Sequence, residues 1–333
     1  MKSKGVWIIG EQHDGKVLTV SYELLSRGRE LSDKLGTELS AVIFGNNIDA
    51  NDLNELIERG ADKVIVVESS ELAYFAVESY SACLIELIKK HCPEIIIAAA
   101  TSMGRTLMPY VAIKVNTGLT ADCTVLDIEE GTGNLLQTRP AIGGNILATI
   151  KTPKHRPQMA TVRPHSTKPA PKQKGRTGAM EKFIPDQYLL TSRTRRLDFI
   201  PYESDHTIQD AEVIVGVGRG IKKGENVRKI EPLLKKLNAA LGATRDVVDR
   251  GWLSYSHQIG LSGKTVNPKL YFALGISGAI QHIAGMQTSE TIIAINNDPD
   301  APIFKVADFG IIGDIFDIVP ALCERLDRRC TNE

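Results

Sequence analysis

Cysteine is scarce in this sequence, and the few residues present are scattered. The five cysteines are odd in number and none belongs to a C-x-x-C pair, so a disulfide-stabilised scaffold is not expected. Structural zinc and iron–sulfur clusters need closely spaced cysteines or histidines, and none of the seven histidines completes such a set. We therefore expect no metal site.

Net charge and long apolar runs are also missing. Forty basic residues balance forty acidic ones, so no overall field would attract nucleic acid or an anionic membrane. No stretch approaches the roughly 20 apolar residues that span a bilayer, and the apolar run at 6–9 is too short for a signal peptide. These absences favour a cytoplasmic protein that neither binds nucleic acid nor inserts into a membrane.

The chain is long enough for two domains, because 333 residues exceed the roughly 250–300 at which a single core stops growing. In its first half, short apolar runs alternate with helical periods. The predicted strands are 6–9, 41–44, 64–67, 95–98 and 123–128, and the predicted helices are 20–35, 52–59, 73–90 and 103–115. Apolar strands separated by helices are typical of a mostly parallel sheet covered on both sides. We predict a doubly wound α/β domain over residues 1–200.

A basic, proline-rich segment lies near the end of this domain. Residues 164–178 contain three prolines, four lysines and arginines and almost no apolar side chains, which is typical of a solvated loop or linker. A nucleic-acid patch is the alternative, but the segment has no interleaved aromatic residue on which bases could stack. We predict a linker.

Strand and helix alternation resumes in the last third of the chain. The predicted strands are 213–217, 270–274 and 291–295, and the predicted helices are about 226–241 and a last one through 316–326. We predict a second, smaller α/β domain over residues 205–333.

Glycines follow the first strand of this second domain. The loop Gly216-Val-Gly218-Arg219-Gly220 would let backbone amides approach a phosphate, and a following helix would present its positive N-terminus. The third glycine comes one residue too early for the G-x-G-x-x-G fingerprint. A tight strand-to-helix turn is therefore the alternative.

A second strand end carries a more specific pattern, Gly275-Ile-Ser-Gly-Ala-Ile-Gln-His282. Small residues here precede a predicted helix start, so the backbone N–H groups of residues 277–280 would be free to bind an anion. Gln281 and His282 would project nearby. For His282 the alternative is a core histidine bonded to a carbonyl group.

Two more strand ends point to the same edge of the sheet. Asn296 follows the predicted strand 291–295, and Asp314 lies in the turn before the last predicted helix; open α/β sheets bind ligands at the carboxyl ends of their strands. Each is alternatively an Asx turn or a helix N-cap. The pair Thr244-Arg245 and the loop 258–264 complete the candidates, with Ser262 able to bond a ring heteroatom. Because no nucleophile-and-base motif is present, we expect a domain that holds a cofactor and has no catalytic residue of its own.

These segments together resemble the alpha subunits of electron-transfer flavoproteins. The resemblance covers nearly the whole chain and is carried by residues 119–124, 139–145, 162–164, 275–282, 294–296, 301–304 and 307–308. It implies one FAD per chain, held in the C-terminal domain and cycling through a semiquinone. The protein would be an electron carrier for acyl-CoA-type dehydrogenases and other redox partners rather than a stand-alone enzyme.

The resemblance also implies a set of cofactor-binding residues. They are Arg219, Thr244, Arg245, Gln258, Ile259, Gly260, Leu261, Ser262, Ser277, Gly278, Ala279, Ile280, Gln281, His282, Asn296 and Asp314. Arg219 and the 277–280 amides would serve the pyrophosphate, and Asn296 and Asp314 the AMP half. The isoalloxazine would lie near Arg245, Ser262, Gln281 and His282, where a cation and an imidazole would favour its reduced state. Leu261 and Ser262 stand where many family members have glutamine and threonine.

The resemblance further implies a heterodimer. A beta subunit, holding AMP or a second FAD, would dock on the N-terminal domain. The 139–145 stretch resembles versions from anaerobes, so an NADH-dependent electron-bifurcating complex is an alternative. Two other classes are also open: a nicotinamide-dependent dehydrogenase, from the 216–220 glycines, and a non-catalytic adenine-nucleotide module.

Overall fold

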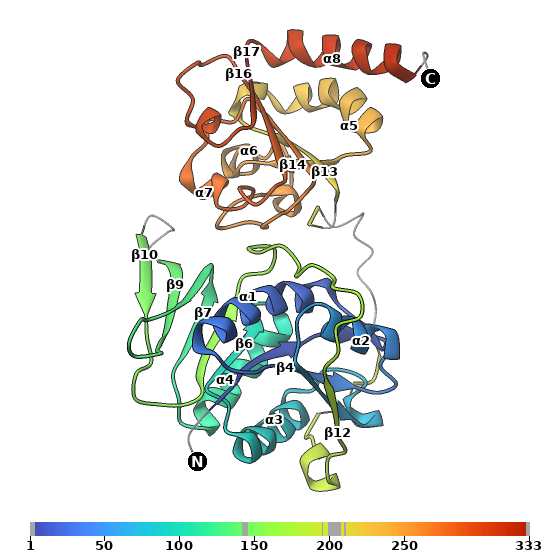
Figure 1. Cartoon of the computed structure of the whole chain (residues 1–333). Helices are drawn as coiled ribbons and strands as arrows, with labels where there is room; N and C mark the ends of the chain where they lie inside the picture. The colour runs from blue at the N-terminus through green and yellow to red at the C-terminus, as the bar shows by residue number, and fades with distance from the viewer. Residues whose placement is uncertain (1–3, 142–145, 195, 199–207, 210, 331–333) are drawn as a thin grey trace. The chain divides into compact units, whose positions relative to one another are not determined.

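The computed structural model describes residues 4–141, 146–194, 196–198, 208–209 and 211–330 (Figure 1). The chain divides into two compact units, Met1–Ile200 and Pro201–Glu333. The expected domain boundary at 200–205 and the end of the 139–145 motif both lie outside the described residues. Each unit is an α/β structure built on a parallel sheet.

The first unit contains a seven-stranded sheet in which every neighbouring pair is parallel. In spatial order its strands are β12 (Ala179–Phe183), β5 (Lys63–Glu68), β4 (Leu39–Gly45), β1 (Val6–Gly10), β6 (Ile95–Ala99), β11 (Gln158–Val162) and β7 (Leu119–Cys123). β1, β4, β6 and β11 are buried along their whole length. This confirms the prediction of a doubly wound, mostly parallel sheet.

Helices cover both faces of this sheet. α1 (Thr19–Leu35) and α2 (Ala50–Glu58) pack on the face that carries Val6 and Ile8. α3 (Val77–His91) and α4 (Ser102–Lys114) pack on the opposite face, with Trp7 and Ile9. Successive strand residues point to opposite faces, so one apolar strand contributes to two separate cores.

A small antiparallel sheet and a hairpin complete the first unit. β8 (Val125–Ile128), β9 (Leu135–Ala141) and β10 (Ile146–Ile150) form the sheet, and β2 (Gln12–His13) and β3 (Lys16–Val17) form the hairpin. The single strand predicted over 123–128 is wrong. Asp122 takes a left-handed conformation with φ 61°, and the chain leaves the main sheet after Cys123 to start β8 in the small one.

Residues 164–178, predicted to be a solvated loop or linker, form neither helix nor strand, and all of residues 171–178 except Arg176 are exposed. The segment crosses the first unit and joins β11 to β12, which is the strand at the opposite edge of the sheet. Its backbone bonds to the helices beneath it, Ala170 N donating to Tyr22 O at 2.9 Å and Gln173 N to Glu58 O at 2.8 Å. Its basic side chains meet acidic ones on that surface, as Arg176 meets Asp62. The segment is therefore a surface loop that these hydrogen bonds and ion pairs hold against the first unit.

The second unit has a five-stranded sheet that is also parallel throughout. Its order is β14 (Ala240–Ala243), β13 (Val213–Val217), β15 (Leu270–Leu274), β16 (Thr291–Asn296) and β17 (Phe309–Ile312). The helices are α5 (Glu231–Leu237), α6 (Arg245–Asp249), α7 (Ile280–Ile283) and α8 (Ile315–Cys330). The strand order reverses between β13 and β15, which is the usual ligand position in such a sheet.

The helix predicted over 226–241 is wrong at both ends. The chain forms a 3-10 stretch, Gly224–Ile230, before α5 begins, and Asn238 ends α5 in a left-handed conformation with φ 48°. The next residues form β14, a strand that the sequence pattern did not indicate. At Gly242 a Cβ would lie 2.4 Å from Ile259 Cδ1, so a larger residue would displace the Ile259 side chain that packs on this strand.

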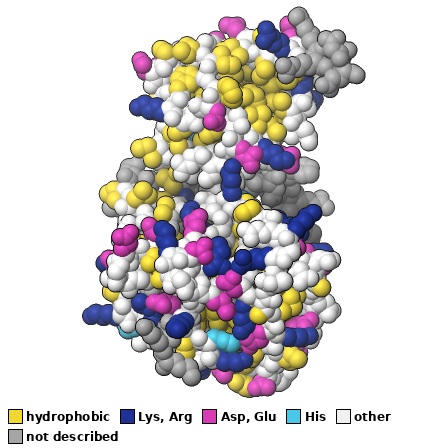
Figure 2. Space-filling model, in the orientation of Figure 1, with side chains coloured by type: hydrophobic (Ala, Val, Ile, Leu, Met, Phe, Trp, Pro, Cys, Tyr) yellow, Lys and Arg dark blue, Asp and Glu magenta, His cyan; other side chains and the backbone are white. Residues whose placement is uncertain are grey.

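Charged side chains of both signs are interspersed over the face of the first unit shown in Figure 2. That face therefore carries no large patch of one sign. No helix among the described residues is long and apolar enough to span a membrane.

Candidate functional site

The loops after β13 and β15 pack backbone against backbone. A Cβ on Gly218 would lie 2.3 Å from the Gly275 carbonyl oxygen, and one on Gly220 would lie 2.6 Å from Gly275 Cα. The N–H groups of Gly218 and Gly220 donate to the carbonyl oxygens of Leu274 and Gly275, at 2.9 and 3.0 Å. The glycines are therefore required by the contact between the two loops, at the reversal of strand order.

The expected helix N-terminus does not follow this glycine loop. The chain instead makes a 3-10 turn, Arg219–Ile221, and α5 starts only at Glu231. A helix dipole is therefore missing at this position, and the exposed Arg219 side chain supplies the positive charge of the loop. The arrangement also departs from a dinucleotide-binding turn, in which the glycines open a helix directly.

The loop after β15 exposes a row of backbone N–H groups. Within the described part of the chain, the amides of residues 277–280 donate to no protein acceptor, and all these residues except Gly278 are exposed. Gly278 fixes the turn: its φ is +90°, and a Cβ there would lie 2.3 Å from Ile303 N. Because α7 is only four residues long, the capacity to bind an anion resides in the individual amides.

Asn296 joins two of these strand ends. Its side chain is buried; Nδ2 donates to Ile276 O at 2.8 Å and Oδ1 accepts from Asp298 N at 3.0 Å. This geometry matches the alternative of an Asx turn. Asn296 supports the loop that carries the amide row, and its direct contact with a ligand stays a prediction.

Asp314 begins the last helix. Its Oδ1 accepts from Phe316 N and its Oδ2 from Lys222 Nζ, both at 2.9 Å. The bond from the Phe316 amide, reinforced by Lys222, lowers the pKa of the Asp314 carboxyl. The residue thus caps α8 and also holds the lysine that follows the glycine loop, which agrees with the N-cap alternative.

Thr244 and Arg245 follow β14 at the same edge. Thr244 N donates to Val217 O at 3.0 Å, which places the start of α6 beside the end of β13. The Arg245 side chain is 70% exposed, with Nε 3.2 Å from Asp249 Oδ2. An exposed guanidinium in a single i,i+4 ion pair keeps donors available for a further partner.

The loop 258–264 lies against the start of α7. Leu261 N donates to Gln281 O at 2.8 Å, and a Cβ on Gly260, whose φ is +140°, would lie 2.7 Å from the same oxygen. Ile259 N donates to Ala243 O at 2.9 Å. The loop is therefore fixed both to β14 and to the segment that follows the amide row.

Ser262 lies exposed at the tip of this loop. Its Oγ accepts a hydrogen bond from Gln258 Nε2 at 3.0 Å. Because that bond uses the hydroxyl as an acceptor, the hydroxyl hydrogen remains able to donate outward. This is the polarity needed to bond an acceptor nitrogen of a bound ring.

His282 is buried, and both of its ring nitrogens have partners. Nδ1 lies 3.0 Å from Ile259 O, and Nε2 lies 3.0 Å from the hydroxyl of Tyr271, a fully buried residue. A carbonyl oxygen can only accept, so Nδ1 carries the hydrogen and Nε2 accepts from Tyr271. Burial lowers the pKa of His282 to about 4, so the imidazole is neutral. The side chain matches the alternative of a core histidine, which leaves arginine as the source of positive charge.

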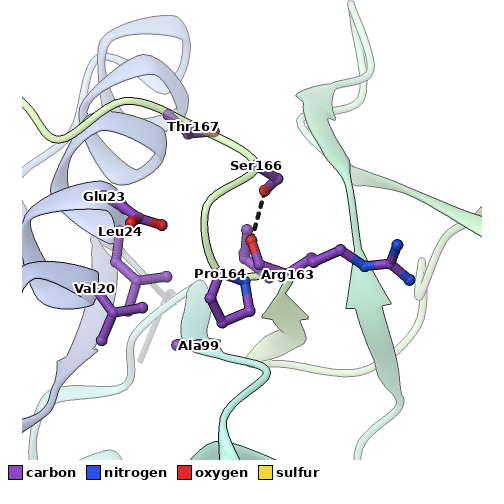
Figure 3. Close-up of a pocket in the computed structure, with 9 residues that line it drawn as sticks. Val20, Glu23, Leu24, Ala99, Arg163, Pro164, Ser166 and Thr167 are labelled. Carbon is purple, nitrogen blue, oxygen red and sulfur yellow. Dashed lines mark hydrogen bonds between the residues drawn. The ribbon is translucent and has the colours of Figure 1, made fainter. Parts of the chain in front are cut away.

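Sequence reasoning missed two buried carboxyl groups in the first unit. Glu11 follows β1, and burial raises its pKa to about 7 although Thr101 Oγ1 donates to it at 2.5 Å. Glu23, on α1, faces the small cavity drawn in Figure 3, beside Pro164 and Thr167. Burial raises the pKa of Glu23 to about 7 although it accepts from His165 N at 2.7 Å. The sequence held a signal for each of these buried carboxyl groups. Glu11 comes directly after a predicted apolar strand, and Glu23 lies among apolar residues of a predicted helix.

The second-unit residues fit a large anionic cofactor with an aromatic ring. The amide row and Arg219 suit a pyrophosphate, while the Ser262 hydroxyl and the Arg245 guanidinium suit a ring that accumulates negative charge. No cluster of three or more His, Cys, Asp and Glu residues that could hold a metal ion occurs among the described residues.

Two family models match most of the chain. Residues 6–187 match the electron transfer flavoprotein domain, and residues 207–287 match the electron transfer flavoprotein FAD-binding domain. The chain is 47% identical to an electron transfer flavoprotein subunit alpha from Thermoanaerobacterium thermosaccharolyticum, over 98% of each protein.

Two further relatives have more specific names. The chain is 41% identical to the LctC subunit of a lactate dehydrogenase (NAD(+),ferredoxin) from Acetobacterium woodii, over 97% of this chain and 77% of that one. It is 40% identical to an acryloyl-CoA reductase electron transfer subunit beta from Anaerotignum propionicum, over 97% and 95% of the two chains.

Proposed function

The chain belongs to the electron-transfer flavoprotein alpha-subunit family, and from this premise we propose that it binds one FAD in its second unit and carries electrons as half of a heterodimer with a beta subunit. The observation that carries the proposal is the exposed amide row at 277–280, beside the reversal of strand order in an FAD-binding domain. FAD, when bound, would supply the redox chemistry.

The residues of the chain would bind and orient the cofactor. The 277–280 amides and Arg219 hold the pyrophosphate, and Asn296 and Asp314 support the loops toward the AMP half. Ser262 donates to a ring nitrogen, and Arg245 places a cation near the ring. Gln258, Ile259 and His282 keep the 258–264 loop and α7 in register through the hydrogen bonds described above.

The test of this proposal is reconstitution. The chain, purified with its beta subunit and incubated with FAD, should retain one flavin per alpha chain, identified by mass after extraction. A heterodimer that remains colourless would contradict the proposal, and an extracted adenine nucleotide without flavin would support the nucleotide-module alternative. The nicotinamide-dependent dehydrogenase has no support, because the glycine loop leads into a 3-10 turn.

The redox partner of the heterodimer has two candidates. The first is an acyl-CoA-type dehydrogenase. The second is an NADH-dependent bifurcating complex, which is favoured by the relative named as a subunit of an NAD- and ferredoxin-linked lactate dehydrogenase. Ferredoxin-dependent oxidation of NADH by the reconstituted complex would support the second candidate. Transfer from a dehydrogenase without any ferredoxin requirement would support the first.

We also propose that the beta subunit docks on the first unit. The small antiparallel sheet exposes Val125, Ile146, Leu147 and Ile150, with Leu147 at 65%, and exposed apolar patches often mark interfaces. Leu147→Asp should weaken the heterodimer in analytical ultracentrifugation, whereas Ile113→Asp, at a 79% exposed position on α4, should not. Equal effects of the two variants would contradict this docking surface.

A further inference from the structure

The loop 258–264 closes on itself in the second unit. Lys264 N donates to Gln258 O at 2.7 Å, and Gly260 N donates to Lys264 O at 3.1 Å. A Cβ on Gly263 would lie 2.4 Å from the Gln258 carbonyl oxygen, so the turn needs a glycine to be this tight. The backbone of the loop is therefore held by its own bonds, with the exposed Ser262 at its tip.

Tyr255 holds this tip from the segment that precedes the loop. It begins the 3-10 turn Tyr255–His257, and His257 Nδ1 lies 2.9 Å from Leu241 O, which fixes the turn beside β14. The Tyr255 hydroxyl donates to Ser262 O at 2.6 Å. Because 66% of its surface is exposed, Tyr255 contributes little to the core, and burial does not account for a tyrosine at this position.

Ser262 has two acceptor oxygens, and both are engaged within the chain. Its carbonyl oxygen accepts from Tyr255, and its Oγ accepts from the buried Gln258 through Nε2 at 3.0 Å. The hydroxyl hydrogen remains available, as does the Ser262 N–H, which donates to no protein acceptor among the described residues. Ser262 therefore presents donors to a ligand.

The bond from Tyr255 also fixes the peptide that joins Ser262 to Gly263. Glycine restricts the rotation of a neighbouring peptide least, so this peptide needs a restraint from outside the turn. A binding group must be held within roughly 0.5 Å of its productive position, and hydrogen bonds from residues behind it provide that precision. The Tyr255 hydroxyl supplies such a restraint to Ser262.

We propose that Tyr255 is a positioning residue for the flavin, because its hydroxyl fixes the Ser262 peptide so that the Ser262 hydroxyl donates to an acceptor nitrogen of the bound ring. This inference rests on the proposed function. A fixed donor at that nitrogen stabilises negative charge that accumulates on the ring. Loosening Ser262 should therefore make the flavin harder to reduce.

The test is redox titration of the heterodimer reconstituted with FAD, as wild type and as Tyr255→Phe, which removes only the hydroxyl. The equilibrium constant for one-electron reduction of the flavin should fall about two- to tenfold, the usual effect of one hydrogen bond. A tenfold fall corresponds to a potential lower by about 59 mV. An unchanged constant in Tyr255→Phe would overturn the proposal.

Tyr188→Phe is the matched control, because Tyr188 lies in the first unit and has the same exposed fraction of 66%. It should leave the equilibrium constant of flavin reduction unchanged, and a fall equal to that of Tyr255→Phe would overturn the proposal.

Ser262→Ala distinguishes action through Ser262 from direct action on the ring. Because Tyr255 acts through the Ser262 hydroxyl, Tyr255→Phe should have no further effect on flavin reduction once that hydroxyl is removed. The same fall in the wild-type and Ser262→Ala backgrounds would overturn the proposed route.

A measurement without FAD checks the bond itself. In protein with serine labelled at the carbonyl carbon, the Ser262 resonance, identified by its loss in Ser262→Ala, should move in Tyr255→Phe and stay in place in Tyr188→Phe. A Ser262 resonance that does not move would overturn the proposed contact. Flavin absorbance separates the two proposals. Wild-type protein without flavin contradicts the proposed function, whereas retained flavin with an unchanged potential in Tyr255→Phe contradicts this inference alone.

Discussion

The two units share one architecture and differ at the carboxyl edge of their sheets. Both have a parallel sheet in which the strand order reverses beside the first strand. In the second unit, glycine backbones meet there and leave a row of amides exposed. In the first unit, the same edge carries aromatic rings and buried carboxyl groups. The ligand class is thus determined by the loops, while the sheet only provides their position.

The largest expected effect comes from adding one methyl group to this edge. Gly218→Ala would place Cβ 2.3 Å from a backbone oxygen, so one loop must move, and we expect a loss of more than about 4 kcal/mol in the second unit. Gly10→Ala meets only ordinary contacts in the first unit and should cost less than about 1 kcal/mol. Urea unfolding measures the free energy of unfolding of the Gly218→Ala and Gly10→Ala variants.

Each unit contains one of the two tryptophans, Trp7 and Trp252. Variants that keep a single tryptophan therefore report the unfolding of each unit separately by fluorescence. If Gly218→Ala and Gly10→Ala proved equally mild, the backbone contact between the loops after β13 and β15 would not be essential.

The second prediction is that the two units respond to pH in opposite directions. Glu11 and Glu23 have pKa values raised to about 7. Above pH 4.5 the unfolded chain therefore binds fewer protons than the folded one, and the first unit loses stability as pH rises to 7, by about 3 kcal/mol per glutamate. The pKa of His282 is lowered to about 4. The second unit therefore loses stability as pH falls from 6.5 toward 4.

Urea unfolding of the single-tryptophan variants between pH 4.5 and 7.5 measures these two slopes. Glu23→Gln should flatten the slope of the first unit, because its carbonyl oxygen can still accept from His165 N without titrating. Parallel slopes in the two units would contradict the assignment of these buried groups.

The third prediction compares two buried tyrosine hydroxyls. Tyr271→Phe leaves His282 Nε2 buried without a donor, which should cost about 1–3 kcal/mol. Tyr80→Phe removes the donor of the Leu72 carbonyl and the contact with Gln12, but both lie beside a cavity from which water can replace the hydroxyl, so the change should cost under about 1 kcal/mol. The same unfolding experiment applies, and nitrogen NMR of labelled histidine checks that His282 carries its hydrogen on Nδ1. A hydrogen on Nε2 would contradict the hydrogen-bond pattern.

The smallest effect concerns charge near the flavin. Arg245→Ala should make the bound flavin harder to reduce, by about 1 kcal/mol or less, because it removes an exposed cation. Arg250→Ala is the control, since Arg250 and Asp246 form an equivalent exposed i,i+4 pair. Redox titration of both variants as holoproteins measures their flavin potentials. Equal potentials in the two variants would place Arg245 away from the ring.

Sequence reasoning located the strongly apolar elements well. The strands predicted at 213–217 and 270–274 have the bounds seen in the structure, because a buried parallel strand needs an unbroken apolar run. β14 was missed because Ala240–Ala243 lacks such a run and is a strand only through pairing with β13. The path of residues 164–178 across the first unit could not be predicted either, because the residues that they bond lie on helices distant in sequence.

The candidate site shows the same limit. The pattern at 275–282 indicated the exposed amides, which depend on local chain conformation. It could not determine the environment of His282, because Tyr271 and Ile259 reach the ring from other elements. Side-chain contacts of that kind follow from tertiary packing.

The crossing segment 164–178 has a consequence for synthesis of the chain. β7 emerges from the ribosome with no partner in the main sheet, because β11, the strand that pairs with it, ends 39 residues later at Val162. β12 is the last strand to arrive, so the seven-stranded sheet is complete only when Phe183 has left the exit tunnel. The second unit starts at residue 201. The nascent protein therefore finishes one sheet before it begins the next, which keeps two similar sets of parallel strands from pairing with each other.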